Sequence, residues 1–162
     1  MAMAESVASY PRPPALVECR QHVRVEALGR LLCDTRRSLR VLETFHPPVF
    51  YLCPEDVDLT LLEPAPGSSY CEWKGVARYF DLVAPGGEAG QPRLRRALWS
   101  YPSPTPAFTP LAGWLACYPA LMDGCWVDGE RVVPQPGGFY GGWITSAVEG
   151  PFKGDPRHPE LR

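Results

Sequence analysis

Four residues that can bind anions or transfer protons recur at three-residue intervals: Arg37, Arg40, Glu43 and His46. In a helical segment this spacing would place them near one face. A carboxylate beside a histidine can orient the ring and raise its pKa, which suits general acid or base catalysis near neutral pH. The two arginines could hold a phosphate or carboxylate through forked hydrogen bonds. The alternative is an exposed helix face whose ion pairs each contribute less than about 1 kcal/mol.

Lysine is rare in this chain. Lys74 and Lys153 are the only lysines among 16 basic residues, and each lies between an aromatic residue and a glycine. A chain that otherwise uses arginine could retain lysine where a compact charge or a titratable amine matters. Lysine depletion also follows from genome base composition, so a ligand-facing role is a hypothesis. Whether the two side chains face a pocket or solvent stays open.

The stretch 137–142 is rich in glycine, but its spacing is that of neither a P-loop nor a dinucleotide-binding turn. Paired glycines on each side of Phe139 and Tyr140 let the backbone turn sharply while these rings and Trp143 are displayed. The segment is therefore either a pocket wall or a packed loop.

The spacing of the aspartates, glutamates and cysteines does not form a clear metal-binding motif. Asp56 with Asp58, or Asp123 with Asp128 and Glu130, could bind magnesium, but turns commonly use these residue types. The six cysteines include no Cys-x-x-Cys pair, which argues against a zinc site. We predict neither a metal nor another cofactor.

Short strands joined by tight turns should position these residues. Alternating apolar and polar positions predict strands at 22–27 with 30–33, 49–52, 76–83 with 94–101, and 125–127 with 131–133. Asp128-Gly129 is typical of a type I′ hairpin. Helices are expected over 36–44, where Pro47 ends the segment, from Pro54, and over 105–118.

The chain has 162 residues, the size of one ordinary domain, and its 20 prolines and 15 glycines favour many short elements. We expect an extended N-terminal arm at 1–14, a β-rich domain at 15–155 and a flexible tail at 156–162. The formal charge of −2 provides no basic field for nucleic acid. No apolar run is long enough to span a membrane, and no export signal begins the chain. We therefore expect a cytoplasmic protein without nucleic-acid or membrane partners.

Several strings carry a resemblance to a known family: DTRR (34–37), LRVLET (39–44), HPPVxY (46–51), PEDV (54–57), YCxxKG (70–75), WSYP (99–102), VDGE (127–130), PQPGGFYGGW (134–143) and GPFKG (150–154). Together they resemble the bacterial "domain of unknown function 427" family. The resemblance extends from Tyr10 to Gly154.

This resemblance implies a mainly β fold: a compact Mss4-like arrangement of several curved antiparallel sheets with two or three short helices, without that fold's zinc. The family also has a nucleotidyltransferase-like label. However, the chain lacks the Gly-Ser and Asp-x-Asp pattern that would hold two metals. The family motif residues found here, none with an established catalytic role, are Arg37, Arg40, Glu43, His46, Lys74, Tyr101, Tyr140, Trp143 and Lys153.

These observations predict a soluble domain that binds a small anionic or polar molecule in a pocket. The predicted ligand-binding residues are Arg37, Arg40, Lys74, Tyr101, Tyr140, Trp143 and Lys153. His46 and Glu43 are the catalytic candidates; an enzyme would be a metal-independent hydrolase or transferase using acid–base chemistry. The alternative is a protein-interaction module that uses the Tyr-Pro arm and the loop 137–143. Catalysis, the identity of the ligand and a homodimer stay open.

Overall fold

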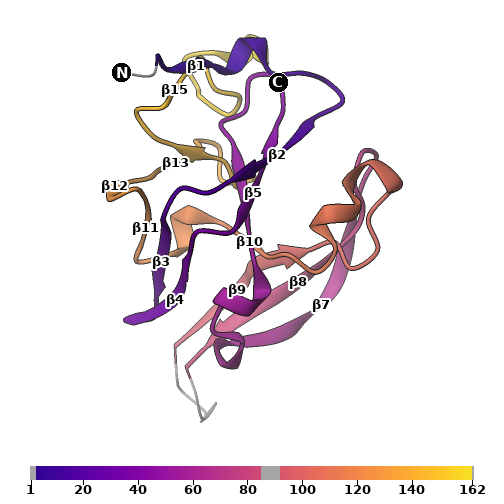
Figure 1. Ribbon diagram of the computed structural model, residues 1–162, viewed down its shortest axis with the longest axis vertical. Coiled ribbons are helices and arrows are strands. Elements are labelled where there is room, and N and C mark those ends of the chain that lie inside the picture. The colour runs from indigo at the N-terminus through magenta and orange to yellow at the C-terminus, as the bar shows by residue number, and fades with distance from the viewer. Residues whose placement is uncertain (1–2, 85–91, 162) are drawn as a thin grey trace.

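The computed structural model describes residues 3–84 and 92–161. Within these ranges the chain is mainly β, as predicted, and every helical segment is a short 3-10 helix. The strands form two four-stranded sheets, one three-stranded sheet and two two-stranded pairs. Both ends of the chain lie at one end of the molecule, and the hairpin of β8 (Gly75–Val83) and β9 (Arg93–Ser100) extends toward the other (Figure 1).

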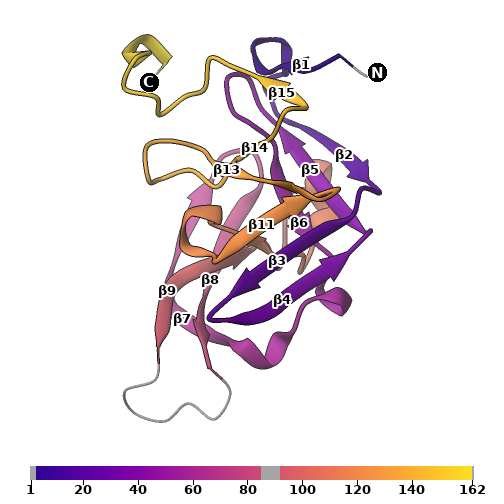
Figure 2. The ribbon, with the colours of Figure 1, turned by 90° about the vertical axis from the view of Figure 1, so that its left-hand side faces the viewer.

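One four-stranded sheet is built from two tight hairpins. Its strand order is β12-β11-β3-β4. The strands are β3 (Val23–Ala27), β4 (Arg30–Thr35), β11 (Gly124–Val127) and β12 (Glu130–Arg131). This sheet faces the viewer in Figure 2. The turn residues Leu28, Gly29, Asp128 and Gly129 have φ of 54°, 70°, 47° and 82°. Such left-handed pairs are what type I′ turns require. Both predicted hairpins are confirmed.

The three-stranded sheet contains β2 (Ala15–Cys19), β5 (Ser38–Leu42) and β6 (Val49–Leu52), in the order β2-β5-β6. The helix expected over 36–44 is therefore wrong, because 38–42 form its central strand. β5 pairs with a neighbour on each side. Pairing with segments distant in sequence thus outweighs the local helical spacing. The short helix expected from Pro54 is confirmed as η2 (Pro54–Asp56).

The second four-stranded sheet has the order β10-β9-β8-β7, where β7 is Leu62–Cys71 and β10 is Ala116–Cys117. It confirms the hairpin of 76–83 with 94–101, whose expected loop at 85–91 lies outside the described residues. The helix expected over 105–118 is wrong. Only η4 (Pro106–Leu111) is helical, with Pro110 inside it and Gly113 beyond it at φ of 77°. Proline lacks the donor that a continuing α-helix needs.

Two short pairs complete the end where the termini lie. β1 (Glu5–Ser6) runs parallel to β15 (Val148–Glu149), and β13 (Val133–Pro134) is antiparallel to β14 (Trp143–Ile144). The remaining 3-10 helices are η1 (Val7–Ser9), η3 (Leu59–Leu61), η5 (Pro119–Leu121) and η6 (Pro159–Leu161). Because β1 lies within the expected N-terminal arm, its pairing with β15 joins that arm to a segment near the C-terminus.

Buried apolar side chains form two main clusters. The larger contains Leu52, Leu98 and Trp143, and the second is rich in aromatic residues such as Tyr51 and Trp99. The aromatic cluster supplies part of the wall of the cavity described below. In the part of the chain that the structure describes, none of the helices combines the length and the apolar character that crossing a bilayer requires.

Candidate functional site

A cavity of about 480 Å³ brings together three parts of the chain. Its wall comes from β5, β6 and the turn between them, from the β7-β8-β9 sheet and neighbouring residues, and from the segment 135–153. Its volume is in the range of small-molecule sites. The lining residues are Val41, Glu43, His46, Val49, Tyr51, Tyr70, Cys71, Lys74, Tyr79, Trp99, Tyr101, Tyr118, Gln135, Phe139, Tyr140, Gly141 and Lys153.

A backbone turn between β5 and β6 brings Glu43 and His46 together. The N–H of His46 donates to the carbonyl of Glu43 at 2.9 Å. Within the turn, Phe45 has φ of 65°, a left-handed conformation that non-glycine residues rarely adopt. The carbonyl of Phe45 accepts from the N–H of Lys153 at 2.7 Å. The N–H of Phe45 donates to the carbonyl of Val7 at 2.9 Å. These bonds hold the turn so that Nε2 of His46 lies 3.9 Å from Oε2 of Glu43.

On its other side, the His46 ring contacts Gln135, a buried residue that follows β13. Nε2 of Gln135 lies 3.0 Å from Nδ1 of His46 and donates to the carbonyl of Lys153 at 2.9 Å. Oε1 of Gln135 accepts from the N–H of Gly142 at 3.2 Å. A β-carbon at position 142 would collide with Oε1 of Gln135 and with Pro47. Glycine is therefore required for this close approach.

His46 is largely buried, and this burial favours the neutral form of its ring. Only 13% of its side chain is exposed. Burial lowers the pKa of the imidazole below its ordinary value of 6.5, because the charged ring would lose hydration. The Glu43 carboxylate opposes this change, whereas Lys153 and Arg12 add to it. The rings of His46 and Tyr140 pack edge to face, with their centroids 5.1 Å apart.

Both lysines of the chain line this cavity. Nζ of Lys74 lies 5.6 Å from the ring centroid of Tyr101, and Nζ of Lys153 lies 6.0 Å from that of Tyr140. Across residues 3–84 and 92–161, neither ammonium group forms an ion pair. Both half-buried cations therefore lack a counter-ion among the described side chains.

The carboxylate of the cavity does not offset these charges. Among the described residues that line the cavity, Glu43 is the one acidic residue. Its Oε2 lies 3.1 Å from a terminal nitrogen of Arg12, which comes from the N-terminal segment. Because Glu43 is paired with Arg12 and His46 is neutral, the cavity keeps a net positive charge from the two lysines.

Aromatic rings and hydroxyl groups form most of the remaining wall. The indole N–H of Trp99 donates to the hydroxyl of Tyr51 at 3.1 Å. Burial raises the pKa of the Tyr51 and Tyr101 hydroxyls, since a phenolate would lose hydration. Both groups therefore remain neutral and can donate a hydrogen bond.

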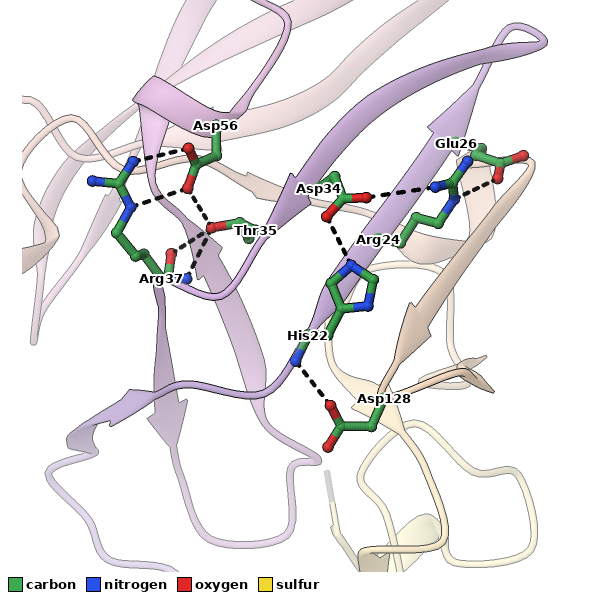
Figure 3. A network of polar contacts seen from close by, with 8 residues as sticks. All are labelled: His22, Arg24, Glu26, Asp34, Thr35, Arg37, Asp56 and Asp128. Atoms are coloured by element: carbon green, nitrogen blue, oxygen red, sulfur yellow. Dashed lines mark hydrogen bonds and ion pairs between the residues drawn. The ribbon is translucent and has the colours of Figure 1, made fainter.

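Two predicted ligand-binding arginines lie elsewhere. Arg37 forms a fork with Asp56, with Nε to Oδ2 at 3.1 Å and a terminal nitrogen to Oδ1 at 2.8 Å (Figure 3). The hydroxyl of Thr35 donates to the same carboxylate at 2.6 Å. Arg40 donates to Glu5 at 2.6 Å. Because 38–42 form a strand, side chains there alternate between faces and do not gather on one helical face.

Trp143 is also placed away from the cavity. It is 1% exposed and stacks on Phe50, with ring centroids 4.7 Å apart. Its position assigns it to the core. The predicted site residues that the cavity does collect are Glu43, His46, Lys74, Tyr101, Tyr140 and Lys153.

The acidic residues considered for magnesium have partners in turns. Asp123 accepts from the N–H of Gly29 at 2.7 Å. Asp128 accepts from the N–H of His22 at 2.8 Å (Figure 3). Over 3–84 and 92–161, no group of three His, Cys, Asp or Glu side chains is arranged to hold a metal.

Sequence reasoning missed three residues of this region. Gln135 lies within the string 134–143, but its contacts with Gly142 and Lys153 depend on the fold. Arg12 reaches Glu43 from the N-terminal segment, which no spacing rule connects to residue 43. Cys71 lines the cavity and is the one cysteine of six that is not buried; its proximity in sequence to Lys74 was the available signal.

The fold and the cavity define a mainly β protein with a cationic pocket lined by lysine, histidine and aromatic residues. The chain belongs to the family described as Domain of unknown function (DUF427), whose sequence model matches residues 15–128. The match includes Glu43, His46 and Lys74, whereas Gln135 and Lys153 lie beyond it. None of the curated proteins compared with the chain matches it.

Proposed function

We propose that this protein binds a small anionic or polar molecule in the 480 Å³ cavity. The observation that carries the proposal is the pair of half-buried lysines, Lys74 and Lys153, without an ion-pair partner among the described residues. Two ammonium groups that line the same cavity favour an anion there, because a carboxylate or phosphate can accept charge-assisted hydrogen bonds from them. His46 and Tyr101 line the same cavity and offer neutral donors to the anion.

The aromatic wall favours a ligand that combines an anionic group with a planar apolar part. Tyr51, Trp99 and Tyr101 are buried, and Phe139 lies at the cavity with 84% of its surface exposed. Flat apolar groups pack favourably on such rings. Benzoate and phenyl phosphate are therefore the first probes, with acetate and inorganic phosphate as probes that lack the ring.

A thermal-shift screen tests the proposal on wild-type protein, Lys74→Gln and Lys153→Gln. Arg30→Gln is the matched control, because Arg30 is exposed at a hairpin tip and lies outside the cavity. We expect an anion to raise the melting temperature of the wild type and the control, and to raise that of each lysine variant less. An equal shift in all four proteins would refute the proposal and would indicate another anion site, such as the groove that Arg20 and Arg36 line.

A protein-interaction module is the second candidate. Phe139 and Tyr70 are 84% and 75% exposed at the edge of the cavity, and exposed apolar patches often mark binding surfaces. The Tyr-Pro arm contributes less to this candidate, because Tyr10 is buried and its hydroxyl donates to Glu5 at 2.7 Å. Pull-down recoveries that are unchanged in a Phe139→Ser, Tyr70→Ser variant would contradict this function.

We also propose that the fold is of the Mss4-like type suggested by the family resemblance. Support comes from the several small antiparallel sheets and the lack of long helices in the described ranges. An experimental structure superposed on Mss4-like proteins would test it; a different strand order would contradict it.

A further inference from the structure

Two backbone groups of opposite character fix the orientation of the Gln135 amide. The N–H of Gly142 can only donate, and it lies 3.2 Å from Oε1. The carbonyl of Lys153 can only accept, and it lies 2.9 Å from Nε2. Reversing the amide would place donor against donor and acceptor against acceptor in a buried setting, which is costly. The nitrogen of the amide is therefore the atom that faces His46.

This orientation determines where the His46 ring carries its proton. Nδ1 of His46 lies 3.0 Å from Nε2 of Gln135, which has a second N–H available to donate. Nδ1 must use its lone pair to accept this bond, so it cannot hold a proton. The single ring proton then resides on Nε2, the nitrogen that lies 3.9 Å from Glu43.

We propose that Gln135 is a positioning residue that holds His46 as the neutral tautomer protonated at Nε2, so that His46 donates a hydrogen bond to a ligand oxygen. The statement about the ligand rests on the proposed function; the statement about the tautomer does not. A neutral imidazole in this state cannot accept a proton at Nε2. The ligand atom beside His46 must then be an acceptor, as the oxygen of a carboxylate, phosphate or carbonyl group is.

Two of the three charged groups around the ring agree with this assignment. A ring N–H that donated to Gln135 would raise the pKa of His46, but the fixed amide presents its nitrogen to the ring. Lys153 and Arg12 disfavour a positive charge on His46, and burial acts in the same direction. Glu43 favours that charge, but it is itself paired with Arg12 at 3.1 Å. The separation of 3.9 Å between Glu43 and Nε2 exceeds a direct hydrogen bond, so the N–H remains available to another acceptor.

Nitrogen-15 NMR of the histidine rings tests the tautomer in the ligand-free protein. The unprotonated nitrogen of a neutral imidazole resonates well downfield of the protonated one, and His46→Gln assigns the signals among the three histidines. We expect Nδ1 of His46 to be unprotonated and Nε2 protonated at pH 7. A proton on Nδ1, or on both nitrogens, would overturn the inference.

Gln135→Glu tests the positioning role. A carboxylate offers only acceptors, so the variant should place a proton on Nδ1 and raise the pKa of His46 above its wild-type value. Gln21→Glu is the matched control, because Gln21 is exposed and bonds Asp128 outside the cavity. The control should keep the wild-type tautomer. An unchanged His46 spectrum in folded Gln135→Glu would contradict the role of Gln135.

Failure of this inference is separable from failure of the proposed function. If benzoate and phenyl phosphate do not bind, the tautomer in the free protein still stands or falls on its own spectrum. If Nδ1 is protonated while the anions still bind through Lys74 and Lys153, the proposed function survives and the role of Gln135 does not.

Discussion

Acidification should destabilise the protein through His46, and His46→Gln should remove that effect. The folded state lowers the pKa of His46 below 6.5, mainly by burial. As the pH falls through 6.5, the unfolded chain takes up a proton that the folded chain excludes, so the free energy of unfolding decreases. The contribution is complete above pH 6.5 and is lost as the pH approaches the folded pKa.

The size of the effect follows from one proton. One pKa unit corresponds to about 1.4 kcal/mol. If the folded ring stays neutral at pH 5.5, His46 lowers the free energy of unfolding by about 1.4 kcal/mol between pH 7.5 and 5.5. A folded ring that begins to charge in this range gives a smaller loss of the same sign.

Urea denaturation at pH 7.5, 6.5 and 5.5 measures this loss in the wild type and in His46→Gln. His158→Gln serves as the control, because His158 is exposed and lies 3.0 Å from Glu160. The decrease should be smaller in His46→Gln than in the wild type or the control. Equal decreases in all three proteins would refute the account of His46 as a buried neutral ring.

Three further changes test the cavity and the core. Cys71 is the one cysteine of six that is not buried, so it should react rapidly with iodoacetamide in the folded protein. Cys71→Ser should abolish this fast phase. A folded wild-type protein that shows no fast phase would contradict the exposure of the cavity. Gly142→Ala should lower the free energy of unfolding by about 1–3 kcal/mol, because the added carbon collides with Gln135 and Pro47; wild-type stability in urea would contradict that packing. Leu98→Ala should cost about 2–5 kcal/mol in the same assay, since Leu98 is fully buried, and a loss below about 1 kcal/mol would place it outside the core.

Local turn chemistry made parts of the fold predictable. Asp128-Gly129 and Leu28-Gly29 adopt the left-handed conformations of tight hairpin turns, and the strands beside them were predicted from alternation. The segment 36–44 was not predictable in this way. Its helical spacing is genuine, but the pairing of β5 with β2 and β6 decides its conformation.

The candidate site was predicted in part, and for a partly incorrect reason. Glu43 and His46 do lie together, but a turn held by Val7 and Lys153 brings them there in place of a helical face. Sequence could not identify Gln135, because its importance depends on the fixed orientation of its amide between two distant backbone groups. The functional roles of these residues stay predictions.

The rate at which iodoacetamide alkylates Cys71 in the presence of phenyl phosphate tests the binding proposal most directly, because the thiol lines the cavity itself. In the wild type and Arg30→Gln, the rate should fall with phenyl phosphate concentration and then level off. In a Lys74→Gln, Lys153→Gln double variant, the protection should be lost. Protection that survives the loss of both lysines, or a rate that no concentration of phenyl phosphate changes in the wild type, would contradict an anion-binding cavity.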